Sequence, residues 1–257
     1  MNQDENQVDD WRLQTIAHLA KDWENPWTGQ LVLEGTRITV STIIPLSNKR
    51  QLTIPLPNAT ALFLSASERA YIQAKQIRKE NEIDQTRHHD VSFKSDALAF
   101  EYLEHIIESI ILAFTAIEAF VNESIPVDYK YVHTKKSEII LEESDKRHIE
   151  RHISIDEKIS KVLPDILNCS SPKTSSCWGK YLELRRVRDR IIHMKSEDRV
   201  SSGPFNKTIW SALFVTPSPT VTAKNLIDYF LRHMEETPLW SRKYSTRITA
   251  DAHLKNN

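Results

Sequence analysis

The spacing of apolar residues changes along the chain. Before residue 60 apolar positions alternate with polar ones in short runs, and later they recur every three or four residues. Alternation predicts strands, because successive side chains of a strand face opposite sides. A spacing of three and four predicts helices with one buried face. The pattern therefore predicts a mainly α chain that begins with a small α+β module.

The first ninety residues carry the mixed pattern. Residues 8–24 are predicted to form a helix that Asn25-Pro26 closes. Three short antiparallel strands are then predicted at Leu31-x-Leu33, Ile38-x-Val40 and Leu52-x-Ile54-x-Leu56. A helix over residues 65–82 follows, with Ala66, Ala70 and Ile77 on its buried side and Ile72 as a further candidate. No cluster of acids, bases and nucleophiles falls on the strands, so we expect a regulatory or recognition module.

A polar segment over residues 84–94 is interpreted as the linker between two domains, at 1–90 and 91–257. It contains His88-His89-Asp90, whose side chains could bind a metal. Adjacent residues of a strand or helix point different ways and rarely share one ion, so the linker interpretation is favoured.

A long helix is predicted over residues 95–124, and it is apolar nearly all round between 110 and 120. Such a helix lies in the middle of a bundle. Glu118 and Asn122 are four residues apart and share one face. They are either buried hydrogen-bonding groups or the lining of a site, and the structural role is favoured.

The second half is predicted to be helical with two irregular parts. Residues 127–141 are expected to be irregular, and His148 and His152 to lie on a solvated charged face, since no Glu directly follows His148. A short helix over 153–167 is expected to be interrupted or to end near Pro164. Residues 170–176 form a loop whose last serines can cap the next helix. An irregular segment is expected next, punctuated by Gly203-Pro204 and Pro217-Ser218-Pro219. Thr220 or Thr222 is then expected to cap a last helix that ends near Pro238.

Composition sets limits on partners and location. Apolar residues make up 40 % of the chain and charged ones 27 %, and the net charge is −1. Any contact with nucleic acid must therefore come from a local patch. No apolar run is long enough for a membrane span, and the N-terminus is too acidic for a signal peptide. We expect a cytoplasmic protein with no membrane partner, whose two cysteines stay reduced.

Residues 180–194 concentrate charge on one predicted helix. Leu184, Val187, Ile191 and Met194 form its apolar stripe. The rest of the helix carries four arginines, at positions 185, 186, 188 and 190, with only Glu183 and Asp189 to offset them. A solvated helix normally mixes Lys with Glu, so this concentration suggests an anionic partner.

Arg188-Asp189, followed by three residues and His193, resembles the Arg-x4–6-His signature of HEPN domains. Residues 111–123 look like the earlier core helix of the same family, with the pattern Ala-Ile-Glu-Ala-Phe-x-Asn-Glu. The resemblance covers roughly residues 95–236. It implies a HEPN-like helical bundle and metal-independent RNA cleavage in a toxin–antitoxin or phage-defence setting. It also implies a homodimer with both motifs in one cleft, and an antitoxin or other regulatory protein as a further partner.

The residue types suit that chemistry. RNA carries its own nucleophile, the 2′-hydroxyl, so cleavage needs a base, an acid and positive charge, and no metal or cofactor is expected. His193 can serve as base or acid, and Arg188 can bind phosphate oxygens. Asp189, four residues before His193, can orient the imidazole or pair with a neighbouring arginine. The cations expected to bind RNA are Arg185, Arg186, Arg190 and Lys195.

Helix geometry leaves two arrangements open. On a continuous helix Arg188 points roughly 140° away from His193. Either Arg186 or Arg190 then acts with His193, or residues of two chains meet across a symmetric pair; Arg188 and His193 are the preferred pair. The alternative function is a catalytically silent HEPN-like module that binds RNA, nucleotide or a protein partner.

Overall fold

The computed structural model describes residues 10–24, 26, 29–85, 90–134, 141–200, 203, 208–242 and 244. The fold is mainly α, with small antiparallel strand pairs, as predicted. Backbone contacts divide the chain into two units: Phe63–Glu235, and the residues before and after it. The predicted boundary at residue 90 therefore differs from this division, which falls within the first helix.

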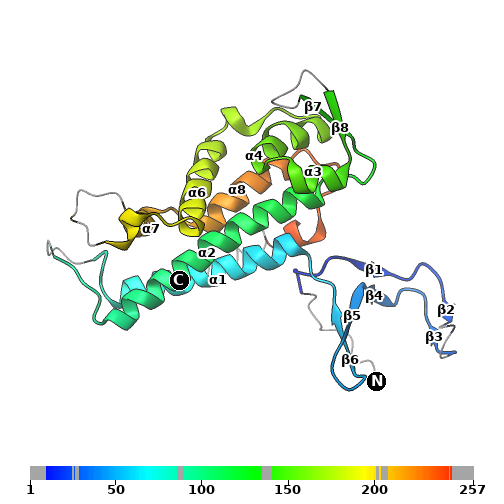
Figure 1. Cartoon of the computed structure of the whole chain (residues 1–257). Coiled ribbons are helices and arrows are strands. Elements are labelled where there is room, and N and C mark those ends of the chain that lie inside the picture. The colour runs from blue at the N-terminus through cyan, green and yellow to red at the C-terminus, as the bar shows by residue number, and fades with distance from the viewer. Residues whose placement is uncertain are drawn as a thin grey trace. The chain divides into compact units, whose positions relative to one another are not determined.

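Strands in the first unit form three two-stranded antiparallel ribbons (Figure 1). β1 (Ile16–His18) pairs with β4 (Arg37–Thr39), and β2 (Trp23–Glu24) pairs with β3 (Leu31–Val32). β5 (Ser41–Pro45) pairs with β6 (Gln51–Pro55) across a turn in which Asn48 and Lys49 have positive φ. The three predicted strands are confirmed as β3, β4 and β6, but each pairs with a strand that the sequence pattern had not indicated.

The helix predicted over residues 8–24 is wrong. Its backbone groups bond to distant segments instead of four residues along: Gln14 N–H donates to the Leu56 carbonyl at 2.9 Å, and Asn58 N–H to the Arg12 carbonyl at 2.7 Å. Leu13 is buried and bridges Pro57. β1 also supplies the only described partner of β4. Hydrogen bonds to distant segments therefore decide the backbone conformation of residues 10–24, and the local helical spacing of apolar residues does not.

α1 (Ala59–Glu80) confirms the helix predicted over 65–82 and begins six residues earlier. Ala70 and Ile77 are buried as expected, whereas Ala66 is partly buried and Ile72 is exposed. α1 is joined to two other helices by buried hydroxyls. Ser67 donates to the Ser109 carbonyl at 2.9 Å, and its hydroxyl lies 2.7 Å from that of Thr220. His88 and His89 lie outside the described residues, so the structure does not test the linker interpretation there.

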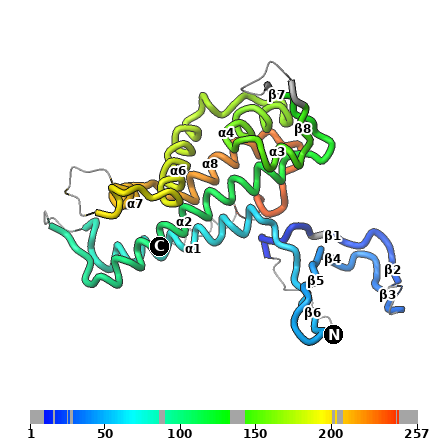
Figure 2. The backbone as a smooth tube through the Cα atoms, in the orientation of Figure 1, coloured from blue at the N-terminus to red at the C-terminus, as the bar shows by residue number. Residues whose placement is uncertain are grey.

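α2 (Asp96–Glu123) corresponds to the helix predicted over residues 95–124 and runs through the larger unit (Figure 2). Ser95 caps it by accepting from Leu98 N–H at 3.3 Å. α2 packs against α6 (Ser176–Ile192) and α8 (Pro219–Leu231). Buried aromatic rings line these contacts: the Phe114 ring stacks on Tyr181, and the Phe120 ring lies tilted against Phe230.

Residues 127–141, predicted to be irregular, contain strand β7 (Tyr131–Thr134), which pairs with β8 (Leu141–Ser144). Tyr131 packs with residues of the following segments in a second small core, which also includes Ile125, Ile149, Ile153 and Val162. This long-range packing explains the hairpin, which local spacing does not show. α3 (Lys146–His152) follows, with the rings of His148 and His152 4.6 Å apart. The described residues contain no group of three metal-binding side chains.

The helix predicted over 153–167 exists in three parts: α4 (Ile155–Glu157), a π-helical turn η1 (Lys158–Val162) and α5 (Leu163–Ile166). The expected interruption near Pro164 is the π turn. Pro164 lacks an N–H, and its ring would clash with the carbonyl four residues before it. Widening the preceding turn relieves that clash, so the helix continues to Ile166.

Three predictions of local structure in the remaining segment are wrong. Ser175 precedes α6, after the short turn η2 (Pro172–Thr174), but its hydroxyl donates to the Pro172 carbonyl and does not cap. α7 (Ile209–Val215) lies where an irregular stretch was expected, after the turn η3 (Ser196–Arg199). Ser218 caps α8, and Thr220 and Thr222 are buried within that helix. None of the described helices is long and apolar enough to cross a membrane.

Candidate functional site

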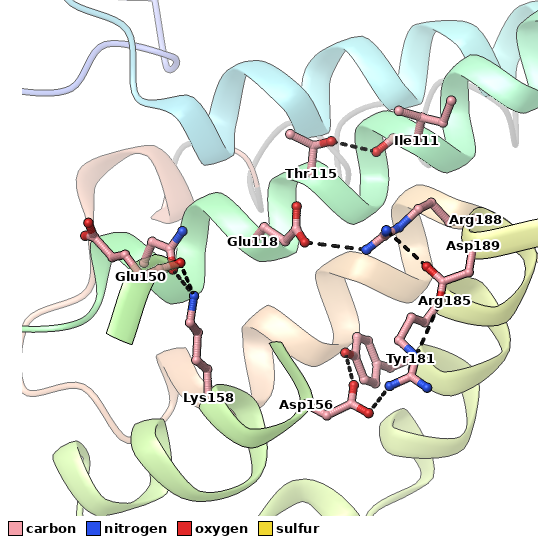
Figure 3. Close-up of polar contacts among 11 residues, drawn as sticks. Ile111, Thr115, Glu118, Glu150, Asp156, Lys158, Tyr181, Arg185, Arg188 and Asp189 are labelled. Carbon is pink, nitrogen blue, oxygen red and sulfur yellow. Dashed lines mark hydrogen bonds and ion pairs between the residues drawn. The ribbon is translucent and has the colours of Figure 1, made fainter. Parts of the chain in front are cut away.

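Residues 111–123 and the arginine-rich segment lie on α2 and α6, and these two helices pack against each other. Arg188 of α6 projects onto α2 (Figure 3). Its Nη2 lies 3.4 Å from Oε1 of Glu118, and its Cζ lies 3.7 Å from the centre of the Phe114 ring. A guanidinium over an aromatic face is held by the ring quadrupole as well as by its ion pair. Arg188 is therefore fixed by two residues of the partner helix.

Asp189 pairs with arginines. Its Oδ1 lies 3.0 Å from Nη1 of Arg188, and its Oδ2 lies 3.8 Å from Nε of Arg185. Of the two roles left open by the sequence, the structure therefore places the Asp189 carboxylate beside arginines. Its backbone carbonyl accepts the His193 N–H at 2.9 Å.

A second carboxylate holds Arg185 from the other side. Asp156 of α4 pairs with Arg185 and accepts the Tyr181 hydroxyl at 2.5 Å (Figure 3). Burial raises the pKa of Tyr181, so its hydroxyl remains a donor. Ser154 positions Asp156 because it caps the short helix on which Asp156 lies.

Lys158, on the π turn, is buried with 5 % of its surface exposed. Its ammonium donates to Oδ1 of Asn122 at 3.0 Å and to the Glu150 carbonyl at 2.8 Å. Burial lowers the pKa of Lys158, and the nearby carboxylates of Glu118 and Glu150 oppose that shift. Asn122 thus binds Lys158, and Glu118, one helical turn before it on α2, lies near both Arg188 and Lys158.

These residues form one polar network. It contains three cations, Lys158, Arg185 and Arg188, and the carboxylates of Glu118, Asp156 and Asp189, with Glu150 also close to Lys158. Glu118 retains 44 % of its side-chain exposure. An anion that reached Arg188 would therefore have to displace a carboxylate, and Glu118 is accessible to solvent.

Arg190 lies outside this network. Its Nε and Nη2 bind the two oxygens of Asp198 at 2.9 and 2.8 Å, and Nη2 also contacts Glu197 at 2.5 Å. Asp198 accepts two backbone N–H groups as well, from Lys195 and Ile209. The pKa of Asp198 is lowered by Arg190 and by these donors. Arg190 therefore fixes the turn between α6 and α7.

His193 lies at the end of α6, and the helix stops at Ile192. Its N–H still donates to the Asp189 carbonyl, but its φ of −117° and ψ of 60° are not helical, so the chain leaves the helix at this residue. The imidazole is exposed and makes no hydrogen bond or ion pair with any residue that the structure describes. Arg186 and Lys195 are exposed too, and neither side chain has a salt-bridge partner in the described parts of the chain.

The predicted stripe of α6 is partly correct. Leu184 and Val187 are buried, whereas Ile191 and Met194 are only partly buried. Tyr181 is fully buried and was not predicted. The burial of Lys158 could have been predicted from the sequence, because helical spacing places it on one apolar face with Ile155, Ile159 and Val162. No sequence pattern marks Asp156 or Asp198, since each finds its arginine only through the fold.

Comparison of the chain with protein-family models, curated proteins and solved structures found no match.

Proposed function

We propose that the chain is a metal-independent endoribonuclease of the HEPN type, with Arg188 and His193 as the catalytic residues. The observation that carries the proposal is the packing of Arg188 against Phe114 and Glu118. The two segments on which the resemblance rests, one on α2 and one on α6, are in contact at Arg188, the arginine of the Arg-x4–6-His motif. His193 stands exposed at the end of the same helix, where a substrate can reach it.

The reaction is an internal transfer. His193 takes the proton of the 2′-hydroxyl, or gives a proton to the leaving 5′-oxygen. The 2′-oxygen bonds to phosphorus, the bond to the 5′-oxygen breaks, and a 2′,3′-cyclic phosphate results. Arg188 stabilises the charge that develops on the phosphate oxygens. One histidine cannot do both proton transfers in one step, so a second copy that supplies its own His193 completes the site.

Binding of RNA would use the exposed cations first. Arg186 and Lys195 are accessible, and Arg188 becomes available when phosphate displaces Glu118. Arg185 and Arg190 are held by Asp156 and Asp198 and contribute to the fold of the site. Their role in RNA binding is therefore indirect.

A second candidate function is a catalytically silent module that binds RNA, nucleotide or a protein partner. One observation favours it: Arg185, Arg188 and Arg190 each have a carboxylate partner. Such pairing lowers the positive charge that a phosphate meets.

The pH dependence of RNA cleavage by the full chain, with and without His193→Ala, tests the two functions. If the chain is the proposed ribonuclease, His193→Ala lowers the cleavage rate by about 10²–10⁴-fold and leaves the RNA affinity unchanged. His152→Ala, which removes another exposed histidine, is the control. Absence of cleavage by the unmodified chain at any pH, with RNA still bound, would instead support the silent module.

A further inference from the structure

The β5–β6 ribbon has one apolar face that carries a cation. Leu46 N–H bonds to the Arg50 carbonyl and Leu56 N–H to the Val40 carbonyl, which fixes the register at both ends. Alternation then puts even-numbered residues on one face. We call this the basic face; it comprises Val40, Thr42, Ile44, Leu46, Arg50, Leu52, Ile54 and Leu56. Val40, Leu46 and Leu52 expose between 42 and 48 % of their surface.

The β2–β3 ribbon has a face of the opposite charge. Glu24 pairs with Leu31, and Leu33 lies on the same side as Leu31. We call these three residues the acidic face. Leu31 and Leu33 each expose 59 % of their surface. Neither Glu24 nor Arg50 has an ion-pair partner within the described ranges.

The edges of the β5–β6 ribbon are poorly suited to further strand pairing. Since even-numbered residues exchange bonds across the ribbon, odd-numbered ones direct their N–H groups outward. Pro45 on β5 and Pro55 on β6 occupy such outward positions and have no N–H to offer. A partner is therefore expected on the face of the ribbon and not at its edge.

We propose that two copies of the chain associate through these ribbons, the basic face of one copy packing on the acidic face of the other, twice about a twofold axis. Every copy carries both faces, so one symmetric dimer covers all four. Leucines meet aliphatic residues, and Arg50 meets Glu24 of the other copy. An isolated two-stranded ribbon is marginal in water, so both ribbons gain from such cover. The association uses ribbons of the first unit alone, so it is a separate contact from the pairing of two His193 residues in the proposed function.

Charge reversal at single positions tests the dimer. In Arg50→Glu protein both contacts place two acids together, and in Glu24→Lys protein both place two bases together. Each variant should associate at least about 10-fold more weakly than the unmodified chain. A mixture of the two variants should recover the association, because both of its contacts are complementary. Sedimentation velocity of the full chain at micromolar concentrations measures this, with Lys79→Glu on α1 as the matched charge control.

An apolar substitution gives an independent measurement. Leu31→Ser should weaken association and leave the unfolding temperature nearly unchanged, since Leu31 is already exposed in the single chain. Val127→Ser, at a residue with 85 % exposure in the other unit, is the control. Equal association of Arg50→Glu, Glu24→Lys and the unmodified chain would overturn the proposal. So would a mixture no stronger than its components. Neither result would bear on cleavage.

Discussion

Glu118 of α2 and Arg188 of α6 face each other across the helix contact at 3.4 Å, although seventy residues separate them in the chain. The distance is long for a charge-assisted hydrogen bond, which is usually 2.7–2.9 Å. Arg188 also contacts Asp189 and the Phe114 ring, so its position depends on three neighbours together. The Glu118 contact is thus the one that a substrate anion can replace most readily.

Arg188→Lys should reduce cleavage by about 10²–10³-fold. A lysine keeps the charge but has neither the planar fork for two acceptors nor the flat group that covers Phe114. Single-turnover rates with saturating RNA measure the effect, and the unfolding temperature is followed in parallel. Arg186→Lys, at an exposed position of the same helix, should change the rate less than about threefold. Equal loss in both variants would contradict the special role of Arg188.

Phe114→Leu should destabilise the protein more than Phe120→Leu does. Both rings are buried on α2, Phe114 against α6 and Phe120 against α8, but only Phe114 lies under a guanidinium. We expect an extra loss of about 1 kcal/mol, the size of a partly desolvated cation–π contact. Urea unfolding measures it. The extra loss should vanish when both variants are compared in an Arg188→Met background.

Acid should weaken the turn after α6. The pKa of Asp198 is lowered in the fold, so the unfolded chain takes up the proton first as pH falls below about 4. The stability that Asp198 contributes is therefore complete above that pH and is lost on acidification. Asp198→Asn should lower stability at neutral pH and abolish this part of the acid dependence. Glu197→Gln, which removes an exposed partner of the same Arg190, should behave like the unmodified chain in acid titrations followed by circular dichroism.

These contacts also mark how far sequence reasoning extends. The apolar spacing over residues 95–124 predicts α2 almost to the residue, because the buried face of a helix is a local signal. The ion pair of Arg190 and Asp198 cannot be predicted from the sequence, because it depends on a turn that forms only in the folded chain. The same holds for residues 10–24, whose helical spacing conceals strands that form only against partners. What local spacing encodes is predicted well, and what non-local pairing decides is not.

Lys158→Met should change the alkaline dependence of stability. The pKa of Lys158 is lowered in the fold, so between that value and its ordinary pKa the unfolded chain binds more protons than the folded one. The unmodified protein therefore gains stability from Lys158 as pH rises through this window, and Lys158→Met lacks the gain. Lys161→Met, in the same turn but with an exposed side chain, is the control. Parallel curves for all three proteins in thermal unfolding from pH 7 to 10 would contradict the burial argument.

The ends of the RNA fragments test the proposed reaction most directly. If His193 acts on the 2′-hydroxyl or the leaving 5′-oxygen, the phosphate closes onto the ribose that carried the nucleophile. The fragments should then end in a 2′,3′-cyclic phosphate or its hydrolysed form and begin with a free 5′-hydroxyl, which mass spectrometry of an oligonucleotide digest can detect. One 2′-deoxy sugar at the cut position should stop cleavage there, because it removes the nucleophile, while cuts at other positions serve as the internal control. Chelator should leave the rate unchanged, since His193 and Arg188 together supply proton transfer and charge. Fragments with a 5′-phosphate and a 3′-hydroxyl would mean that water attacked the phosphorus, and the assignment of Arg188 and His193 would then fail.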